Sequence, residues 1–167
     1  MLKLVLTYSL SSFFFGLFGV SWDAIDRKID REYPQIPFIT SDSLQQKLQE
    51  SAPQLVIIDV REAEEFAVSH LETALNIQTG DGVAEQIDAK DTPIVVYCSV
   101  GYRSAGVAAR LQELGYSNVS NLRHSIFNWA ERGYPLANKL GSTDKIHPFN
   151  TAWGSLVDSD LHAYEPE

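Results

Sequence analysis

The only cysteine of the chain, Cys98, lies where a buried strand is predicted to end and a helix to begin. The apolar residues 94–97 (IVVY) predict the strand, and the loop CSVGYR leads into a helix expected to start at Ser104. Backbone amides of such a loop, with the positive end of the helix dipole, can point at one spot and hold an anion. Arg103 adds a positive charge nearby, which favours the thiolate over the thiol. The pattern predicts a nucleophilic sulfur rather than a structural thiol.

The composition narrows the chemistry that the chain can support. A single cysteine excludes an intramolecular disulfide, a thiolate-rich zinc site and an iron–sulfur cluster. The sequence also lacks the glycine-rich fingerprints of nucleotide and flavin sites, so we expect neither a metal nor a cofactor. A formal net charge of -9 argues against a nucleic-acid partner, which usually meets clustered Lys and Arg. An anionic ligand must therefore be held by local donors rather than by long-range attraction.

The elements around Cys98 predict an α/β fold. Short apolar runs rich in β-branched residues are typical of parallel strands covered on both faces. Such runs lie at 55–60, 94–97 and 119–122, with a weaker one at 74–77. Helices are expected between the strands, at 41–50, from Glu62, at 104–114 with Gly115 as the C-terminal cap, and at 126–132. This alternation indicates a mostly parallel central sheet with helices on both faces, and ligands bind at the carboxyl ends of such strands.

The two ends of the chain differ from this central part. The uncharged apolar run 4–20 behind Lys3 predicts a signal peptide or an uncleaved membrane anchor over residues 1–21. We therefore expect an exported protein of the bacterial periplasm, with membrane association at the N-terminus if the leader is kept. An amphipathic linker is predicted over 22–36, a domain over 37–137 and a C-terminal extension over 138–167. The last ten residues are expected to form a solvated acidic tail.

Three segments carry a family resemblance. They are LVIIDVREAEEFAVSHLETALNI at 55–77, VVYCSVGYRSAGVAARLQELGY at 95–116 and NWAERGYPL at 128–136. In this order and spacing the chain resembles the rhodanese-like family, in particular single-domain sulfurtransferases of the thiosulfate sulfurtransferase type. The resemblance implies that Cys98 takes a sulfur atom from a small anionic donor such as thiosulfate and holds it as a persulfide. Cyanide or a thiol, including a protein thiol, would then remove it.

The resemblance also implies roles for individual residues. The residues expected to bind substrate around Cys98 are those of its loop: Ser99, Val100, Gly101, Tyr102, Arg103 and Ser104. Asp59 and Arg61 would support the site, although a helix cap and a surface ion pair explain them equally well. His70 is interpreted as a structural hydrogen-bonding residue rather than a catalytic base.

Other functions fit the same fold. Tyrosine-phosphatase-like enzymes have a loop in which a His precedes the Cys and an Arg follows it after five residues. Here Tyr97 precedes the cysteine, and Ser104 stands where that arginine would fall. A phosphatase is therefore disfavoured. A persulfide carrier or docking module and an inert structural domain remain as alternatives, and the intact CSVGYRS loop argues against the inert domain.

Two departures from the family pattern bear on the site. LETA follows His70 where Ile-Pro-Gly-Ala is usual, which affects a turn. Arg123, His124 and Ser125 stand where paired glycines are common, and we hypothesise that Arg123 and His124 contact an anionic substrate or narrow the pocket. In the extension, the aromatic side chains at 147–153 are expected to pack against the domain, with a partner surface as the alternative.

Overall fold

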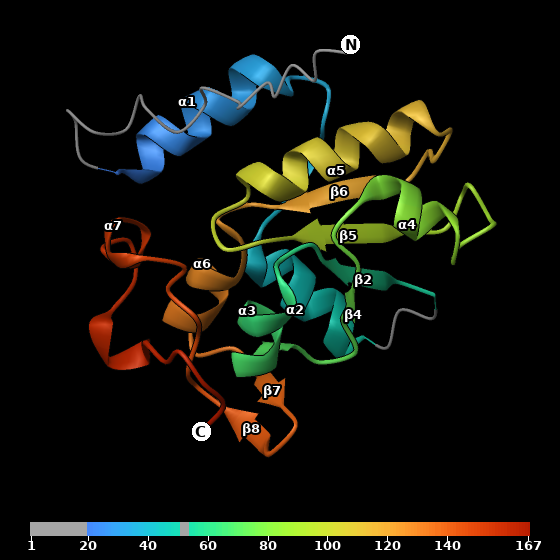
Figure 1. The fold of residues 1–167 in the computed structure, drawn as a ribbon. Coiled ribbons are helices and arrows are strands. Elements are labelled where there is room, and N and C mark those ends of the chain that lie inside the picture. The colour runs from blue at the N-terminus through green and yellow to red at the C-terminus, as the bar shows by residue number, and fades with distance from the viewer. Residues whose placement is uncertain (1–19, 51–53) are drawn as a thin grey trace, which may run out of the picture.

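The computed structural model describes residues 20–50 and 54–167 (Figure 1). The predicted leader over residues 1–21 lies outside them except for its last two residues, so its nature stays a prediction. Within the described ranges, no helix has the length and apolar character needed to cross a membrane.

A parallel five-stranded sheet forms the centre of the structure (Figure 1). Its spatial order is β1-β6-β5-β2-β4. The strands are β1 (Phe38–Ile39), β2 (Val56–Asp59), β4 (Leu75–Asn76), β5 (Ile94–Tyr97) and β6 (Val119–Leu122). The predicted strands at 94–97 and 119–122 are confirmed at the same bounds, and those at 55–60 and 74–77 are confirmed as shorter elements.

Side chains of the central strands alternate between two apolar cores. Ile57 and Val95, which are neighbours across β2 and β5, belong to one core. Ile58 and Val96 belong to the other core, together with Cys98. Because both faces of β5 are buried, its residues must be apolar on both sides, which explains the continuous run IVVY. Cys98 follows β5 on the face of the second core.

Helices cover both faces of the sheet, as predicted (Figure 1). Residues of α4 (Gly80–Ala84) and α5 (Tyr102–Glu113) contribute to the core that contains Cys98. Residues of α2 (Ser41–Gln49) and α6 (Ser125–Glu131) contribute to the opposite core. The short α3 (Ala63–Val68) follows β2. The sheet thus holds the Cys98 loop between helices on either side.

Local sequence explains where the helices begin. Thr40 caps α2 by accepting the Ser43 backbone N–H at 3.2 Å, and Glu62 begins α3 in a reciprocal capping box with Glu65. The predicted start of α5 at Ser104 is wrong, because the helix already begins at Tyr102. Its N-cap is Gly101 with φ +106°, a left-handed conformation that favours glycine.

The amphipathic helix predicted after the leader is present as α1 (Trp22–Glu32). It lies beside α5 (Figure 1), where the Tyr102 hydroxyl donates to Glu32 Oε2 at 2.6 Å. Ile25 is buried in the core. Residues 22–32 are therefore packed against the domain rather than extended away from it.

A second sheet and the C-terminal segment cover one end of the domain. The strands β3 (His70–Leu71), β7 (Leu136–Asn138) and β8 (Gly141–Thr143) are antiparallel. Beyond them, α7 (Thr151–Gly154) and a 3-10 helix (Ser159–Leu161) return to the domain. Ile146 is fully buried, and it pairs with the last turn through Ala163 N–H to Ile146 O at 2.9 Å. The expectation of a solvated tail from residue 158 is therefore wrong for 161–163, whereas Ser159 and Asp160 are exposed.

Candidate active site

Cys98 lies at the carboxyl end of β5 with only 1% of its surface exposed. The loop that follows folds back over its sulfur, so that the Gly101 N–H donates to Cys98 Sγ at 3.1 Å. The Ser104 hydroxyl, on the first turn of α5, lies 3.5 Å from the same sulfur. The backbone N–H of Cys98 itself donates to Ser125 Oγ at 3.1 Å. The sulfur therefore faces donors from the loop and from the start of a helix.

Arg103 is fixed beside this loop by a carboxylate that sequence reasoning did not identify. Its Nη1 and Nη2 atoms donate to Glu65 Oε2 and Oε1 at 2.9 and 2.8 Å, and Nη2 also donates to Ser99 Oγ at 3.0 Å. The Glu65 side chain is 4% exposed, whereas that of Arg103 is 33% exposed. Burial raises the pKa of Glu65, but its bonds to Arg103 outweigh burial and lower that pKa overall.

The surroundings of Cys98 favour its thiolate. Burial raises the thiol pKa, whereas the positive charge of Arg103 and the hydrogen bonds from Ser104 and Gly101 lower it, and the net shift is downward. A buried thiolate that keeps a depressed pKa is a reactive nucleophile. The charge and the donors expected around Cys98 are therefore present.

Asn121 holds the loop from the neighbouring strand β6. Its Nδ2 donates to Gly101 O at 2.9 Å, and its Oδ1 accepts the Ser104 hydroxyl at 2.7 Å. The side chain is buried. Asn121 therefore fixes both ends of the turn that carries the amide facing Cys98.

The predicted loop residues surround one pocket, although not all of them line it. Those that border the pocket are Cys98, Ser99, Val100, Tyr102 and Arg103, joined by Phe149 and Trp153 from the C-terminal extension. Gly101 and Ser104 contact the sulfur but do not line the pocket. The pocket has a volume of about 130 Å³. The expectation that 147–153 packs against the domain holds for Phe149, whose ring covers the Arg103 guanidinium at 5.0 Å.

Asp59 and Arg61 form an ion pair that is fully buried, so the interpretation as a surface pair is wrong. Arg61 Nη2 lies 2.6 Å from Asp59 Oδ2 and donates to Ser69 O at the same distance. Neither residue lines the pocket. The charge of Arg61 does lower the pKa of Glu65, so the pair acts on the site through the carboxylate that holds Arg103.

Arg123 and His124 do not line the Cys98 pocket, contrary to our hypothesis. Arg123 Nη2 and His124 Nε2 lie 2.6 and 3.1 Å from Asp26, and these contacts attach α1 to the loop after β6. His124 and Ser125 adopt φ values of +57° and +49°, the conformation that glycines would provide at these positions. His70 has the structural role expected, because its Nδ1 lies 3.0 Å from Phe66 O and its ring stacks on that of Phe66.

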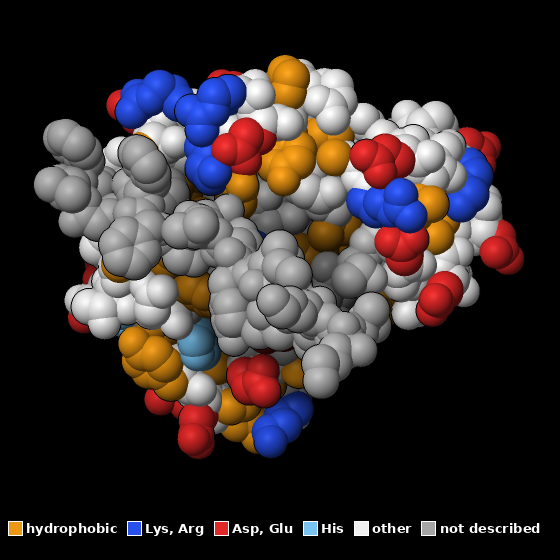
Figure 2. All heavy atoms as spheres, turned by 45° about the horizontal axis from the view of Figure 1, so that its top comes forward, with side chains coloured by type: hydrophobic (Ala, Val, Ile, Leu, Met, Phe, Trp, Pro, Cys, Tyr) orange, Lys and Arg blue, Asp and Glu red, His pale blue; other side chains and the backbone are white. Residues whose placement is uncertain are grey.

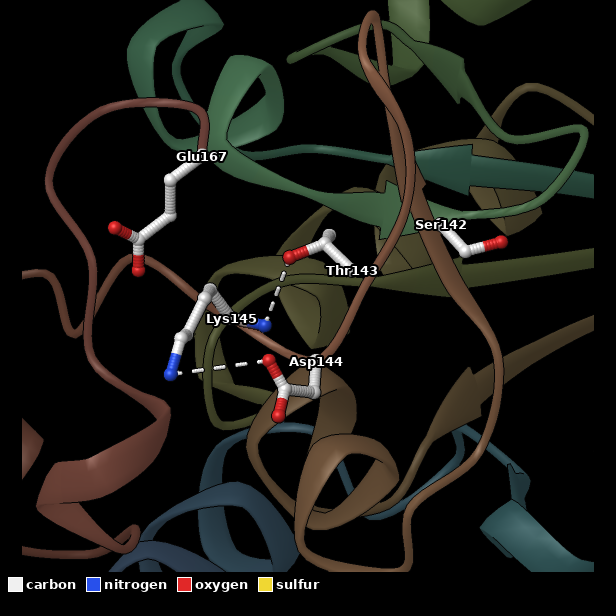
Figure 3. Close-up of a pocket in the computed structure, with 5 residues that line it drawn as sticks. All are labelled: Ser142, Thr143, Asp144, Lys145 and Glu167. Carbon is white, nitrogen blue, oxygen red and sulfur yellow. Dashed lines mark hydrogen bonds and ion pairs between the residues drawn. The ribbon is translucent and has the colours of Figure 1, made fainter.

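A larger hollow, of about 410 Å³, lies where β8 meets the carboxyl end of the chain (Figure 3). Ser142, Thr143, Asp144, Lys145 and Glu167 line it. Lys145 Nζ lies 3.8 Å from Asp144 Oδ1, and the Asp144 side chain is 76% exposed. This hollow holds solvated charges and no activated nucleophile, so it is not the candidate active site.

Charge on the outer surface offers little further guidance. On the face shown in Figure 2, a group of basic side chains lies at the upper left beside acidic ones, and the other basic side chains are mixed with acidic ones. Exposed ion pairs on the described surface include Arg110 of α5 with Asp81 of α4 and with Glu113. Within residues 20–50 and 54–167, no cluster of His, Cys, Asp or Glu side chains has the geometry of a metal site.

Comparison with known proteins agrees with this geometry. The family model of the rhodanese-like domain matches residues 40–132. A sulfurtransferase of Allochromatium vinosum is 33% identical over 104 residues, covering 62% of this chain and 96% of the relative. A rhodanese-like domain protein from Staphylococcus aureus has a similar crystal structure, with a TM-score of 0.54, 31% identity and coverage of 62% of this chain and 99% of that one. The chain therefore belongs to the rhodanese-like family.

Some relatives carry this domain within longer proteins of other activity. A tRNA uridine(34) hydroxylase of Sodalis glossinidius is 28% identical over 120 residues, or 67% of this chain. The match spans only 34% of that hydroxylase. Family membership consequently establishes the fold, while the particular reaction must be argued from the site.

Proposed function

We propose that this protein is a sulfurtransferase in which Cys98 carries a sulfane sulfur as a persulfide. The observation that carries the proposal is the donation of the Gly101 N–H to Cys98 Sγ at 3.1 Å, in a loop that also presents Ser104 and the charge of Arg103. Donors fixed before the reaction stabilise a charge that develops on sulfur as they would stabilise an oxyanion.

The first half of the cycle loads the cysteine. The Cys98 thiolate attacks the outer sulfur of a donor such as thiosulfate, the sulfur–sulfur bond of the donor breaks, and sulfite leaves with the electron pair. The product is a Cys98 persulfide anion. No proton has to move, because both the attacking and the leaving groups are anions. Arg103 supplies a positive charge beside the anionic donor, and Glu65 and Ser99 hold its guanidinium in place.

The second half unloads the persulfide. A thiophilic acceptor attacks the outer sulfur, the persulfide bond breaks, and Cys98 returns as a thiolate. With cyanide the product is thiocyanate, and with a thiolate it is a new persulfide. The depressed pKa of Cys98 makes its thiolate a good leaving group in this step.

The direct test compares the wild-type protein with Cys98→Ser, which keeps the size of the side chain. We expect thiocyanate to form from thiosulfate and cyanide with the wild type alone, and intact mass to show one added sulfur atom after incubation with thiosulfate. An adduct without turnover would indicate a persulfide carrier that needs its own acceptor. Equal thiocyanate formation by the two proteins, or no adduct and no turnover, would refute the proposal.

We also propose export to the periplasm, which is supported only by the apolar run of residues 4–20. Cell fractionation would test export, and sequencing of the mature N-terminus would distinguish cleavage near residue 21 from a retained membrane anchor.

A further inference from the structure

The segment after β8 forms one side of the Cys98 pocket. Phe149 and Trp153, here called the C-terminal wall, line the pocket opposite the cysteine loop. Both residues lie outside the span 40–132 of the family domain. The wall is therefore a contribution of this chain's own extension to the site.

Hydrogen bonds fix the backbone of the C-terminal wall. The Phe149 N–H donates to His147 Nδ1 at 3.1 Å, in a turn that gives Phe149 a φ of +65°. Asn150 caps the short helix α7 by accepting the Trp153 N–H at 3.1 Å. A Cβ atom added to Gly154 would lie 3.0 Å from the His162 ring, so α7 and the returning chain are in close contact. The backbone that carries both aromatic residues is thus fixed; Trp153 packs against the core, whereas Phe149 is 43% exposed and lies against Arg103.

The wall leaves little room around the sulfur. Cys98, Ser99 and Val100 are 1%, 4% and 6% exposed, so the sulfur is reached through the pocket and not from the open surface. The pocket volume of about 130 Å³ is well below the roughly 300–1,000 Å³ of pockets that hold drug-sized ligands. A cysteine of a folded protein would bring its own backbone and neighbours to the opening, where Phe149 and Trp153 lie.

Contacts with Glu65, Ser99 and Phe149 reduce the surface that Arg103 presents to a large partner. Its guanidinium edge is bound to Glu65 and Ser99, and one face is covered by the Phe149 ring. An acceptor that reaches the sulfur must therefore pass Phe149 and Trp153, beside an Arg103 side chain that is one-third exposed.

We propose that Phe149 and Trp153 are specificity-determining residues that admit small acceptors, such as cyanide or a slender low-molecular-weight thiol, and exclude the cysteine of a folded protein. The inference rests on the proposed sulfur transfer, and it chooses between the two kinds of acceptor that the family resemblance leaves open.

Turnover by matched variants provides one test. We would compare Phe149→Ala and Trp153→Ala with the wild type and with Leu140→Ala, which removes an exposed apolar side chain of the same extension away from the pocket. The acceptors would be cyanide and a reduced thioredoxin, a folded protein with an exposed thiol. We expect the wall variants to raise the ratio of thioredoxin to cyanide turnover about tenfold or more, a range that steric selection can supply. An unchanged ratio in both variants would overturn the proposal.

A second measurement needs no turnover. Since Cys98 is the only cysteine, alkylation rates report on one site. We would compare iodoacetamide with a maleimide coupled to a large polymer. Phe149→Ala and Trp153→Ala should raise the alkylation rate of the bulky maleimide far more than that of iodoacetamide. Leu140→Ala should change neither rate. If no variant transfers sulfur while this ratio still rises, the proposed function fails and the steric role stands. If transfer occurs but neither ratio moves, the wall does not select the acceptor.

Discussion

Replacing Arg103 with methionine tests the electrostatic design of the site. The substitution keeps most of the side-chain stem and removes the charge that pairs with Glu65. Removing one partner of a fully buried ion pair costs about 3–5 kcal/mol, because the other charge is left uncompensated. Exposed pairs are worth only about 0–1 kcal/mol. Because a third of the Arg103 side chain is exposed, water can reach Glu65 in the variant, and we expect a loss of about 2 kcal/mol at pH 7.

The pH dependence of this loss has a definite sign. In the wild type the pKa of Glu65 is lowered, so its contribution to stability is present above the ordinary carboxyl pKa and disappears as pH falls. Without Arg103, the lowering by Arg61 and the Glu62 N–H remains, but burial, the largest influence, moves the pKa of Glu65 upward, so the variant gains more from protonation of Glu65 as pH decreases. The difference in unfolding free energy between the two proteins should therefore be largest near neutral pH and shrink toward acid pH.

Urea unfolding at several pH values measures this difference. Arg110→Met is the matched control on the same helix, because its ion pairs are exposed to solvent, and it should leave stability unchanged within error. Adding Glu65→Gln to Arg103→Met should restore part of the loss at neutral pH. Arg103→Met should also move the midpoint of Cys98 alkylation to higher pH, because the charge that lowers the thiol pKa is gone. A loss that does not vary with pH, or an unmoved alkylation midpoint, would refute the reasoning.

Three further predictions concern the supports of the site. Arg61→Met leaves Asp59 as a buried, uncompensated charge and should cost about 3–5 kcal/mol by urea unfolding, whereas a cost below that of Arg103→Met would contradict the assigned burial. In Gly101→Ala the added Cβ lies no closer than 3.5 Å to any atom, yet at φ +106° the substitution should cost about 1–3 kcal/mol of backbone strain. It should also slow alkylation of Cys98. Wild-type stability and alkylation would show that the Gly101 backbone conformation is not needed. Asp26→Asn should speed hydrogen exchange in α1 without changing turnover. A large loss of turnover would instead indicate that His124 contributes to the active site.

The sequence predicted those parts of the molecule that depend on local pattern. The runs 94–97 and 119–122 have their observed bounds because strands buried on both faces need continuous apolar residues. The position of Cys98 follows from the same pattern. Glu65 and Asn121 were missed, because their partners lie 38 and 20 residues away in the chain and no local spacing reveals such contacts.

Contacts between distant segments also explain the corrected expectations. Asp59 and Arg61 are two residues apart, which suggests an ion pair. The burial of that pair depends on segments elsewhere in the chain, which local sequence does not reveal. Arg123 and His124 bind Asp26, about a hundred positions earlier in the chain. The positive φ of His124 and Ser125 was not predicted, nor was the residue that the His124 side chain contacts.

The buried position of Ile146 has a practical consequence for anyone who shortens this chain. The recognisable family domain ends at residue 132, which makes that boundary a natural place to cut. Such a truncation would remove Ile146 from the apolar core and strip away the strand pairing of β7 with β3. It would also expose the cysteine on its aromatic side. A minimal domain made in this way would be less stable, and measurements on it would describe a pocket without Phe149 and Trp153.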